Sequence, residues 1–249
     1  LLRRCVEDYD MIAPGERVAV GVSGGKDSLV LLAALARLAQ FYPGGFSVEA
    51  FTVDMGTPGM DLSPLADYCR ELGVPFHRIP TQMYHVIFET RREKNPCALC
   101  AKMRRGSLHT ALLEAGIHKV ALGHHYDDAV ETFFLSLFYE SRLSCFHPVT
   151  YLDRTDITQI RPLLYVSEAM IREAVPRLQL PVVHNRRRPH QAPGGQNPHC
   201  LPGTPVSQTE GVRLRRYAAP PPPPLGPPGT PPAAAHGMSH CHRIASSFF

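Results

Sequence analysis

No stretch of about 18 uninterrupted apolar residues occurs in the 249-residue chain, and a helix that spans a membrane needs about that length. The first residues, Leu-Leu-Arg-Arg-Cys-Val-Glu-Asp, are not expected to be a signal peptide, because they are too acidic and too short in their apolar run. The absent initiator Met suggests a fragment. The sequence therefore predicts a cytoplasmic protein with no membrane segment.

A regular disulfide framework is absent as well. The seven cysteines are an odd number at irregular spacing, whereas secreted disulfide scaffolds usually carry an even number in a regular pattern. We therefore expect free thiols or metal ligation.

Acidic residues are almost missing from the C-terminal segment. Residues 186–249 contain only Glu210 against seven Lys and Arg, a net charge of +6, whereas residues 1–185 carry a net charge of −2. The same segment holds 14 of the 25 prolines and has almost no aliphatic periodicity. This composition predicts a folded domain over residues 1–185 and a Pro/Arg-rich disordered tail over residues 186–249.

The most informative feature of the chain is Ser-Gly-Gly-Lys-Asp-Ser at residues 23–28. It follows a strand-like apolar run at residues 18–22 and precedes a helix-like apolar pattern at residues 29–38. A turn in this context brings backbone N–H groups and the positive end of a helix dipole to one point. The motif therefore predicts a phosphate-binding loop.

Each residue type in this loop suits an anion. Gly24 and Gly25 allow positive φ and a close approach of the backbone, and Lys26 adds a positive charge. The hydroxyls of Ser23 and Ser28 add hydrogen-bonding capacity. A Walker A loop is excluded, because Val20 stands where its first glycine belongs and Asp27 follows the lysine. The competing interpretation is an ordinary Gly-Ser turn.

Strand and helix patterns alternate along the rest of the domain. We expect strands at residues 46–54, 74–79, 119–122 and 180–183, the last at an edge, and helices at 62–72, 98–115, 129–139 and after Ser167. The alternation predicts an α/β fold with a parallel, doubly wound sheet, whose ligands bind at the carboxyl ends of the strands.

A second polar motif, Leu-Gly-His-His-Tyr-Asp-Asp-Ala-Val-Glu-Thr at residues 122–132, lies between a predicted strand and a predicted helix. A structural interpretation is available: Asp128 and Glu131 fit a capping box, Gly123 fits the strand exit, and the histidines fit a polar loop. Alternatively, carboxylates beside a triphosphate hold magnesium, which prefers oxygen ligands.

Two further carboxylates are candidates at the same edge of the sheet. Asp27 is a second candidate for a magnesium ligand. Asp54 follows the second predicted strand, and that position favours contact with a nucleoside.

Cys97 and Cys100 form a C-x-x-C pair at a predicted helix start. A helix N-terminus lowers the pKa of thiols, so the pair could bind zinc or an iron–sulfur cluster, or cycle as a dithiol. Two unreactive cysteines packed against the sheet remain the alternative.

The motif S-G-G-K-D-S resembles the PP-loop of ATP pyrophosphatases, which cleave ATP between the α and β phosphates and leave AMP on the substrate. With P-C-A-L-C and L-G-H-H-Y-D-D in this order, residues 1–185 resemble the tRNA 2-thiocytidine synthetase family known as TtcA. The resemblance implies a PP-loop (adenine nucleotide alpha hydrolase-like) fold. In that family the PP-loop adenylates the C2 oxygen of cytidine 32 in the tRNA anticodon loop, and a 4Fe-4S cluster on three cysteines delivers sulfur.

Carried over by position, the resemblance implies ATP, Mg²⁺ and a 4Fe-4S cluster as cofactors. Its implied partners are tRNA and a sulfur donor such as a cysteine desulfurase, and a homodimer is compatible with it. Lys26 and Asp27 would be catalytic, with Asp27 also on magnesium, and Cys97 and Cys100 would be two of the three cluster ligands. The implied ATP-binding residues are Ser23, Gly24, Gly25, Lys26, Asp27, Ser28, Asp54, Gly123 and Asp128.

The basic residues around the C-x-x-C pair, above all Arg104 and Arg105, would meet the cluster or tRNA phosphates. A solvated basic helix face is the commoner explanation of such a run. The other members of the run are Arg91, Arg92, Lys94 and Lys102.

The chain departs from the family after Asn185. The family's third cysteine belongs there, but Arg-Arg-Arg-Pro follows and no cysteine occurs before Cys200. Codons can be chosen for residues 190–200 so that a shift of one base encodes Thr-Lys-Arg-Gln-Glu-Val-Lys-Thr-Leu-Ile, a basic amphipathic helix of the kind the family has there. We therefore favour a frameshift over a proline-rich interaction arm.

The favoured function is an ATP-dependent, iron–sulfur tRNA thiolase. The alternatives are another PP-loop tRNA modifier, a thiouridine or lysidine synthase, and an inactive nucleotide- or zinc-binding remnant. The C-x-x-C pair argues against the lysidine reaction, which needs no sulfur.

Overall fold

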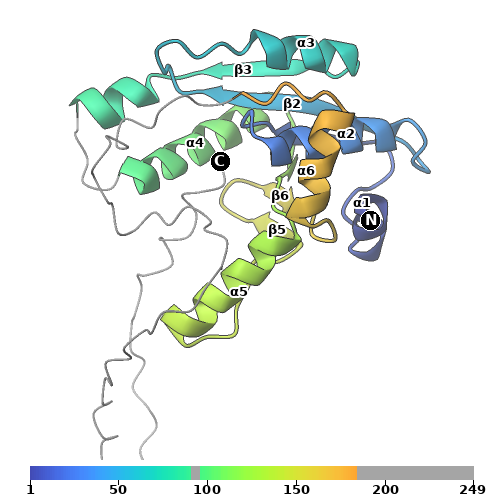
Figure 1. Cartoon of the computed structure of the whole chain (residues 1–249). Coiled ribbons are helices and arrows are strands. Elements are labelled where there is room, and N and C mark those ends of the chain that lie inside the picture. Colours follow the sequence, from blue (N-terminus) through green and yellow to red (C-terminus); the bar gives the residue numbers. More distant parts are fainter. Residues whose placement is uncertain (91–95, 184–249) are drawn as a thin grey trace, which may run out of the picture. The chain divides into compact units, whose positions relative to one another are not determined.

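The structure is a computed structural model that describes residues 1–90 and 96–183 (Figure 1). Six strands form one sheet in the order β3-β2-β1-β4-β6-β5. The strands are β1 (Glu16–Gly21), β2 (Phe46–Asp54), β3 (Phe76–Pro80), β4 (Lys119–Ala121), β5 (Val149–Leu152) and β6 (Ile157–Ile160). The helices are α1 (Leu2–Asp8), α2 (Lys26–Ala39), α3 (Ser63–Glu71), the π-helical η1 (His85–Thr90), α4 (Pro96–Glu114), α5 (Tyr126–Glu140) and α6 (Glu168–Arg177).

The sheet is parallel except at one edge. Strand β1 pairs in parallel with β2 and β4, and β6 continues the parallel set beside β4. Strand β5 is antiparallel to β6, to which a short turn connects it. The expected α/β fold with a mostly parallel sheet is confirmed, but the sequence analysis missed β5 and β6 and therefore the antiparallel edge.

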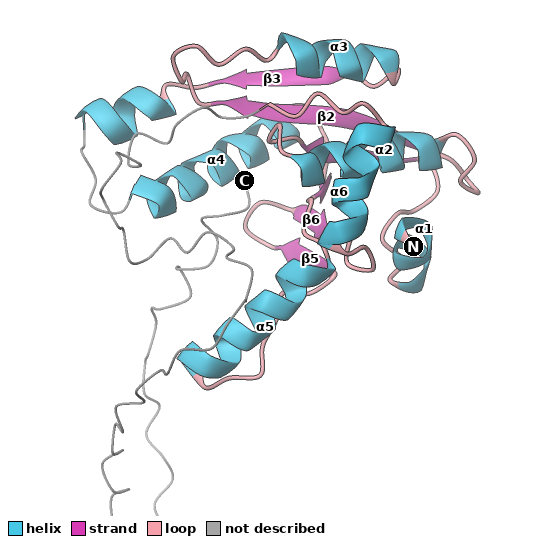
Figure 2. Cartoon of the chain, viewed as in Figure 1, coloured by secondary structure: helices cyan, strands magenta, loops and turns pink. Residues whose placement is uncertain are grey.

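Helices cover both faces of the sheet (Figure 2). Successive residues of a strand point to opposite faces, so Val18 and Val20 in β1 pack with α2, α3 and α6, whereas Ala19 packs with α4. Among the helices of the described part of the chain, α2 is the most deeply buried, because leucines and alanines recur on nearly all of its sides. This burial fixes the start of α2, and with it the loop at residues 23–28.

Several sequence-based boundaries are confirmed. Strand β2 covers residues 46–54 as predicted, and α3 ends before Gly73, whose φ of +67° only glycine adopts readily. Ser167 is the N-cap of α6, where its Oγ accepts a hydrogen bond from Met170 N at 3.4 Å.

Two expectations are wrong. Helix α5 begins three residues earlier than predicted, so Asp128 lies at its third position and caps His125 N instead of forming a capping box with Glu131. Residues 180–183 are not a strand, although Val183 donates one backbone hydrogen bond to Gly24. The predicted tail at residues 186–249 lies outside the described residues, so the domain boundary stays a prediction.

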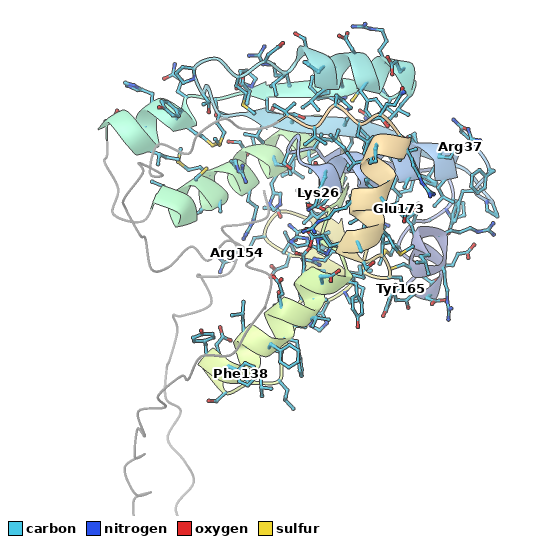
Figure 3. All side chains as sticks on the ribbon, viewed as in Figure 1. Lys26, Arg37, Phe138, Arg154, Tyr165 and Glu173 are labelled. Carbon is cyan, nitrogen blue, oxygen red and sulfur yellow. The ribbon has the colours of Figure 1, made fainter. Side chains whose placement is uncertain are left out.

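Helix α5 carries exposed aromatic side chains near its C-terminal end. Phe138, labelled in Figure 3, is 73% exposed, and its ring stacks on that of Phe134. Within the described ranges, no helix has both the length and the apolar character needed to cross a membrane.

Candidate ATP site and its surroundings

The loop between β1 and α2 is shaped by glycine and by the last residue the structure describes. Gly24 has a φ of +81°, and a Cβ added there would lie 3.2 Å from the Cβ of Val183. Val183 N donates a hydrogen bond of 3.0 Å to Gly24 O. Position 24 therefore requires glycine both for its backbone conformation and for the close approach of Val183.

The two serines of the loop bond to the loop itself. Ser28 Oγ donates to Gly25 O at 3.0 Å and accepts from Ser23 N at 3.2 Å. Ser23 Oγ lies 3.2 Å from Ser28 Oγ. The hydroxyls thus brace the turn, while the first N–H groups of α2 are left without intrahelical partners. Such a helix start suits an anion, and in this respect the residues present fit a nucleotide phosphate.

Lys26 adds a positive charge that is held between two carboxylates. Its Nζ lies 2.9 Å from Asp27 Oδ1 and 3.2 Å from Glu168 Oε1, at the start of α6. Partial burial alone would lower the pKa of Lys26, but the two carboxylates raise it above its usual value. The ammonium group is therefore charged at neutral pH and forms ion pairs with both carboxylates.

The second motif packs directly against the start of α2. A Cβ added at Gly123 would lie 3.1 Å from Ser28 N and 3.2 Å from Asp27 C. Gly123 therefore has a clear role in packing, because it lets the loop after β4 approach the first turn of α2. Direct contact between Gly123 and ATP stays a prediction.

His125 lies at the centre of the acidic residues of both motifs. Its Nε2 is 3.8 Å from Asp27 Oδ1 and 3.5 Å from Asp128 Oδ2, and its Nδ1 is 3.7 Å from Asp127 Oδ2. The side chain of His125 is buried. A buried imidazole between carboxylates links the PP-loop-like motif to the second motif.

Asp128 is deeply buried and acts mainly as a helix cap. Its Oδ2 accepts a hydrogen bond of 2.8 Å from His125 N. Burial raises the pKa of Asp128, and the nearby charges of Asp27 and Glu131 act in the same direction, against the His125 N–H. This capping hydrogen bond and the burial of the carboxyl group favour a structural role for Asp128. A contact between Asp128 and ATP stays a prediction. A contact between Asp27 and magnesium stays a prediction as well.

Asp127 joins the site to α6. Its Oδ2 accepts a hydrogen bond of 2.7 Å from Glu168 N, the first residue of α6. Three segments far apart in the sequence therefore meet at the carboxyl ends of β1 and β4, namely residues 23–28, 122–132 and 167–168.

His124, in the same loop after β4, is partly buried. Burial, with the positive charge of Arg161 nearby, lowers the pKa of His124 to about 3. Its ring lies 5.1 Å from that of Phe146, which also lies under the Arg161 guanidinium. His124 is therefore neutral at physiological pH and packs against Phe146.

Asp54 lies at the end of β2, as predicted, and forms an ion pair there. Its Oδ2 accepts from Arg78 Nε at 2.9 Å and from Arg78 Nη2 at 2.5 Å, and its Oδ1 accepts from Gly56 N at 2.9 Å. Burial alone would raise the pKa of Asp54, but these donors lower it below the usual value. The carboxylate is fully engaged, and its contact with a nucleoside stays a prediction.

A cavity lies between the phosphate-binding loop and α4. Its lining residues are Val22, Ser23, Phe51, Thr52, Val53, Met55, Met60, Arg104 and Leu108. Its lining mixes apolar side chains with the polar Ser23, Thr52 and Arg104, and its volume is about 40 Å³. Binding of the base and sugar of a nucleotide there stays a prediction.

Cys100 is next to this cavity. Its Sγ lies 3.5 Å from Met55 Sδ, and Arg104 Nη1 lies 4.0 Å from the same sulfur. Arg104 thus faces the cavity, whereas Arg105 is exposed. The side chain of Cys97 lies outside the described residues. Among the side chains that are described, no three His, Cys, Asp or Glu residues are grouped as metal ligands, so the described part alone does not form a cluster site.

The other described cysteines differ from Cys100. Cys5 and Cys69 are free thiols inside the core, where burial raises the pKa of each to about 11. Cys145 is a half-buried free thiol that donates to Ala129 O. Cys5 and Cys69 therefore pack as core side chains.

Comparison with known protein families agrees with this geometry. Residues 2–184 match the family model described as PP-loop domain. The chain belongs to this family.

Several relatives found by sequence share one name. The chain is 42% identical over 174 residues to the tRNA-cytidine(32) 2-sulfurtransferase of Geobacter sulfurreducens, covering 70% of this chain and 66% of that protein. It is 40% identical to the proteins of the same name from Alkalilimnicola ehrlichii and Pelobacter propionicus, covering 59% and 67% of their lengths. The resemblance to TtcA proteins is confirmed, although the chain spans only about two thirds of the relatives it matches.

Two solved structures share the fold. The U34-tRNA thiolase NcsA from Methanococcus maripaludis, solved with its [4Fe-4S] cluster, has a TM-score of 0.61 at 24% identity, over 77% of this chain and 66% of that chain. A phosphoadenylyl-sulfate reductase from Candida auris, in a phosphate complex, has a TM-score of 0.50 at 12% identity, over 73% of this chain and 81% of that chain. These likenesses show the PP-loop type of α/β fold.

Sequence reasoning missed Glu168, Arg78 and the link made by Asp127. Glu168 directly follows a recognised N-cap, Ser167, so it is placed at a helix start. Its approach to Lys26 depends on the position of β6 next to β4. Because β6 was not predicted, no sequence signal placed α6 beside the loop.

Proposed function

We propose that this chain uses ATP to activate a cytidine of tRNA for replacement of its C2 oxygen by sulfur. The observation that carries the proposal is the glycine-rich loop at residues 23–28, at the start of α2 and packed against the second motif, in a chain with relatives named tRNA-cytidine(32) 2-sulfurtransferase. The adenylation step, the sulfur source and the substrate of this chain are all part of the proposal.

The chemistry follows from the poor leaving ability of an oxygen on a pyrimidine ring. The C2 oxygen attacks the α-phosphorus of ATP, pyrophosphate leaves, and AMP becomes attached to the base. A sulfur nucleophile then forms the C–S bond as AMP departs with the oxygen. Lys26 and the N-terminus of α2 would stabilise the charge on the phosphates, and Asp27 would hold magnesium against the leaving pyrophosphate.

Cys97 and Cys100 would hold an iron–sulfur cluster in a protein that supplies a third cysteine, and the cluster would deliver the sulfur. This chain lacks that cysteine at the family's position. We therefore expect the adenylating half of the reaction to be retained and the sulfur-transfer half to be impaired.

Lys26→Ala and Asp27→Ala should each abolish formation of AMP and pyrophosphate from ATP and tRNA. The matched control is Arg37→Ala, because Arg37 lies in the last turn of the same helix, away from the loop (Figure 3). Product analysis by anion-exchange chromatography measures the outcome. Release of ADP and phosphate by the unaltered chain would refute the proposed chemistry.

The tRNA product gives the second readout. A strain that lacks the gene should lose 2-thiocytidine from its tRNA and regain it with a gene whose reading frame after Asn185 is restored. Nucleoside mass spectrometry measures this loss. Unchanged 2-thiocytidine would exclude the cytidine assignment, and loss of a thiouridine would favour a uridine substrate.

A further inference from the structure

Glu168 forms an ion pair with the lysine of the phosphate-binding loop. Its Oε1 lies 3.2 Å from Lys26 Nζ, and both side chains are about one third exposed. Lys26 lies beside helix α6 (Figure 3). A carboxylate at this position is unexpected at the edge of an anion site, because it repels the phosphates that the loop would bind.

The position of Glu168 does not depend on Lys26. Asp127 Oδ2 accepts from Glu168 N at 2.7 Å, and Ser167 caps the same helix. Arg172, one turn along α6, donates to Glu168 Oε1 at 2.9 Å. The carboxylate is therefore held from its backbone and from its own helix, at a fixed distance from the loop.

We propose that Glu168 is an internal counter-ion of the phosphate-binding loop. Glu168 holds Lys26 when no ATP is bound and yields Lys26 to the phosphates when ATP binds. The inference rests on the proposed binding of ATP at residues 23–28. Carboxylate and phosphate oxygens compete for the N–H donors of the same ammonium group, so the phosphates of ATP would weaken the ion pair between Lys26 and Glu168.

This competition has a use in the reaction. Pyrophosphate, the product of the adenylation step, carries a high negative charge and binds the same groups as the phosphates of ATP. When Lys26 returns to Glu168, the enzyme's contact with pyrophosphate is replaced by an internal one. Glu168 is thus a positioning residue that weakens triphosphate binding and favours release of pyrophosphate.

The test compares Glu168→Gln with Glu173→Gln in the full chain. Glu173 lies on the same helix (Figure 3) but pairs with Arg177, so it is the matched control. Glutamine at position 168 keeps the size of the side chain and both backbone caps of α6. Isothermal titration with ATP, inorganic pyrophosphate and adenosine measures the effect.

We expect Glu168→Gln to lower the Kd for ATP and for pyrophosphate by about 2- to 5-fold, the range typical of partly exposed ion pairs. Binding of adenosine should not change, because adenosine carries no phosphate, whereas a general structural defect would weaken all ligands. The gain should shrink in 0.5 M salt, which screens exposed charges. Glu168→Ala should act in the same direction.

Unchanged or weaker ATP binding in both variants at position 168, with the unaltered chain binding ATP, would overturn the counter-ion role alone. If the unaltered chain binds neither ATP nor pyrophosphate, the proposed function itself fails, and the inference fails with it. Circular dichroism of the variants confirms that each is folded before the affinities are compared.

Discussion

Replacement of Gly123 by alanine tests whether the two motifs are held together by close backbone packing. The added Cβ would lie 3.1 Å from Ser28 N, 3.2 Å from Asp27 C and 3.3 Å from Ser28 Cα. Ordinary contacts of a Cβ are longer than about 3.4 Å. All three neighbours are backbone atoms in the first turn of a buried helix, so they cannot move aside as a flexible side chain would.

The expected cost is about 1–3 kcal/mol, the range for overpacking in a well-packed interior. In a domain of this size each kcal/mol shifts Tm by about 2–4 °C. Because the displaced atoms belong to the phosphate-binding loop, Gly123→Ala should also weaken ATP binding. Differential scanning calorimetry with and without ATP measures both effects.

The matched control is Gly106→Ala. Gly106 lies inside α4, and a Cβ added there would meet no atom within 4 Å. Alanine in a helix interior is favoured over glycine by about 0.5–1 kcal/mol, so this variant should be more stable than the unaltered chain. If Gly123→Ala is equally stable and binds ATP normally, the packing argument is wrong.

Two further predictions concern charge and thiol reactivity. Arg78→Met should lower the free energy of unfolding at pH 7 by less than about 1 kcal/mol, because Arg78 is 61% exposed. This difference in unfolding free energy should vanish in acid, because the pKa of Asp54 is lowered in the folded state and its ion pair is lost as the pH falls through that pKa. Urea titrations at several pH values measure the difference. A difference that stays constant with pH would contradict the prediction. Iodoacetamide should leave Cys5 and Cys69 unmodified in the folded protein, because burial raises the pKa of each thiol to about 11. Half-buried Cys100 should be alkylated faster, as peptide mass mapping would show, and equal labelling of all three would contradict the burial argument.

The parts of the fold that were predictable are those in which local pattern and tertiary structure agree. Strand β2 is a long segment rich in aromatic and β-branched residues, and Gly73 and Gly116 follow the ends of α3 and α4 with φ values of +67° and +65°. The loop at residues 23–28 was found because its glycines, charge and flanking patterns all indicate the same structure.

The parts that were missed depend on contacts between distant segments. Strands β5 and β6 have four residues each, and β5 is a partly exposed edge strand with no clear alternation. The start of α5 was misplaced because His125, a weak N-cap by type, is stabilised by Asp128 and by burial between carboxylates. No local sequence pattern predicts an N-cap that is stabilised in this way.

The hydrogen bond between Val183 N and Gly24 O has a consequence for the order in which the protein is made. The loop lies near the N-terminus of the chain, yet Val183, which closes it, lies 159 positions further along than Gly24, and Glu168 also comes late. A ribosome must therefore complete nearly the whole domain before the loop acquires its final contacts. Fragments that end before residue 168 should collapse without a finished phosphate-binding site, and nucleotide binding would then report that the whole domain is complete.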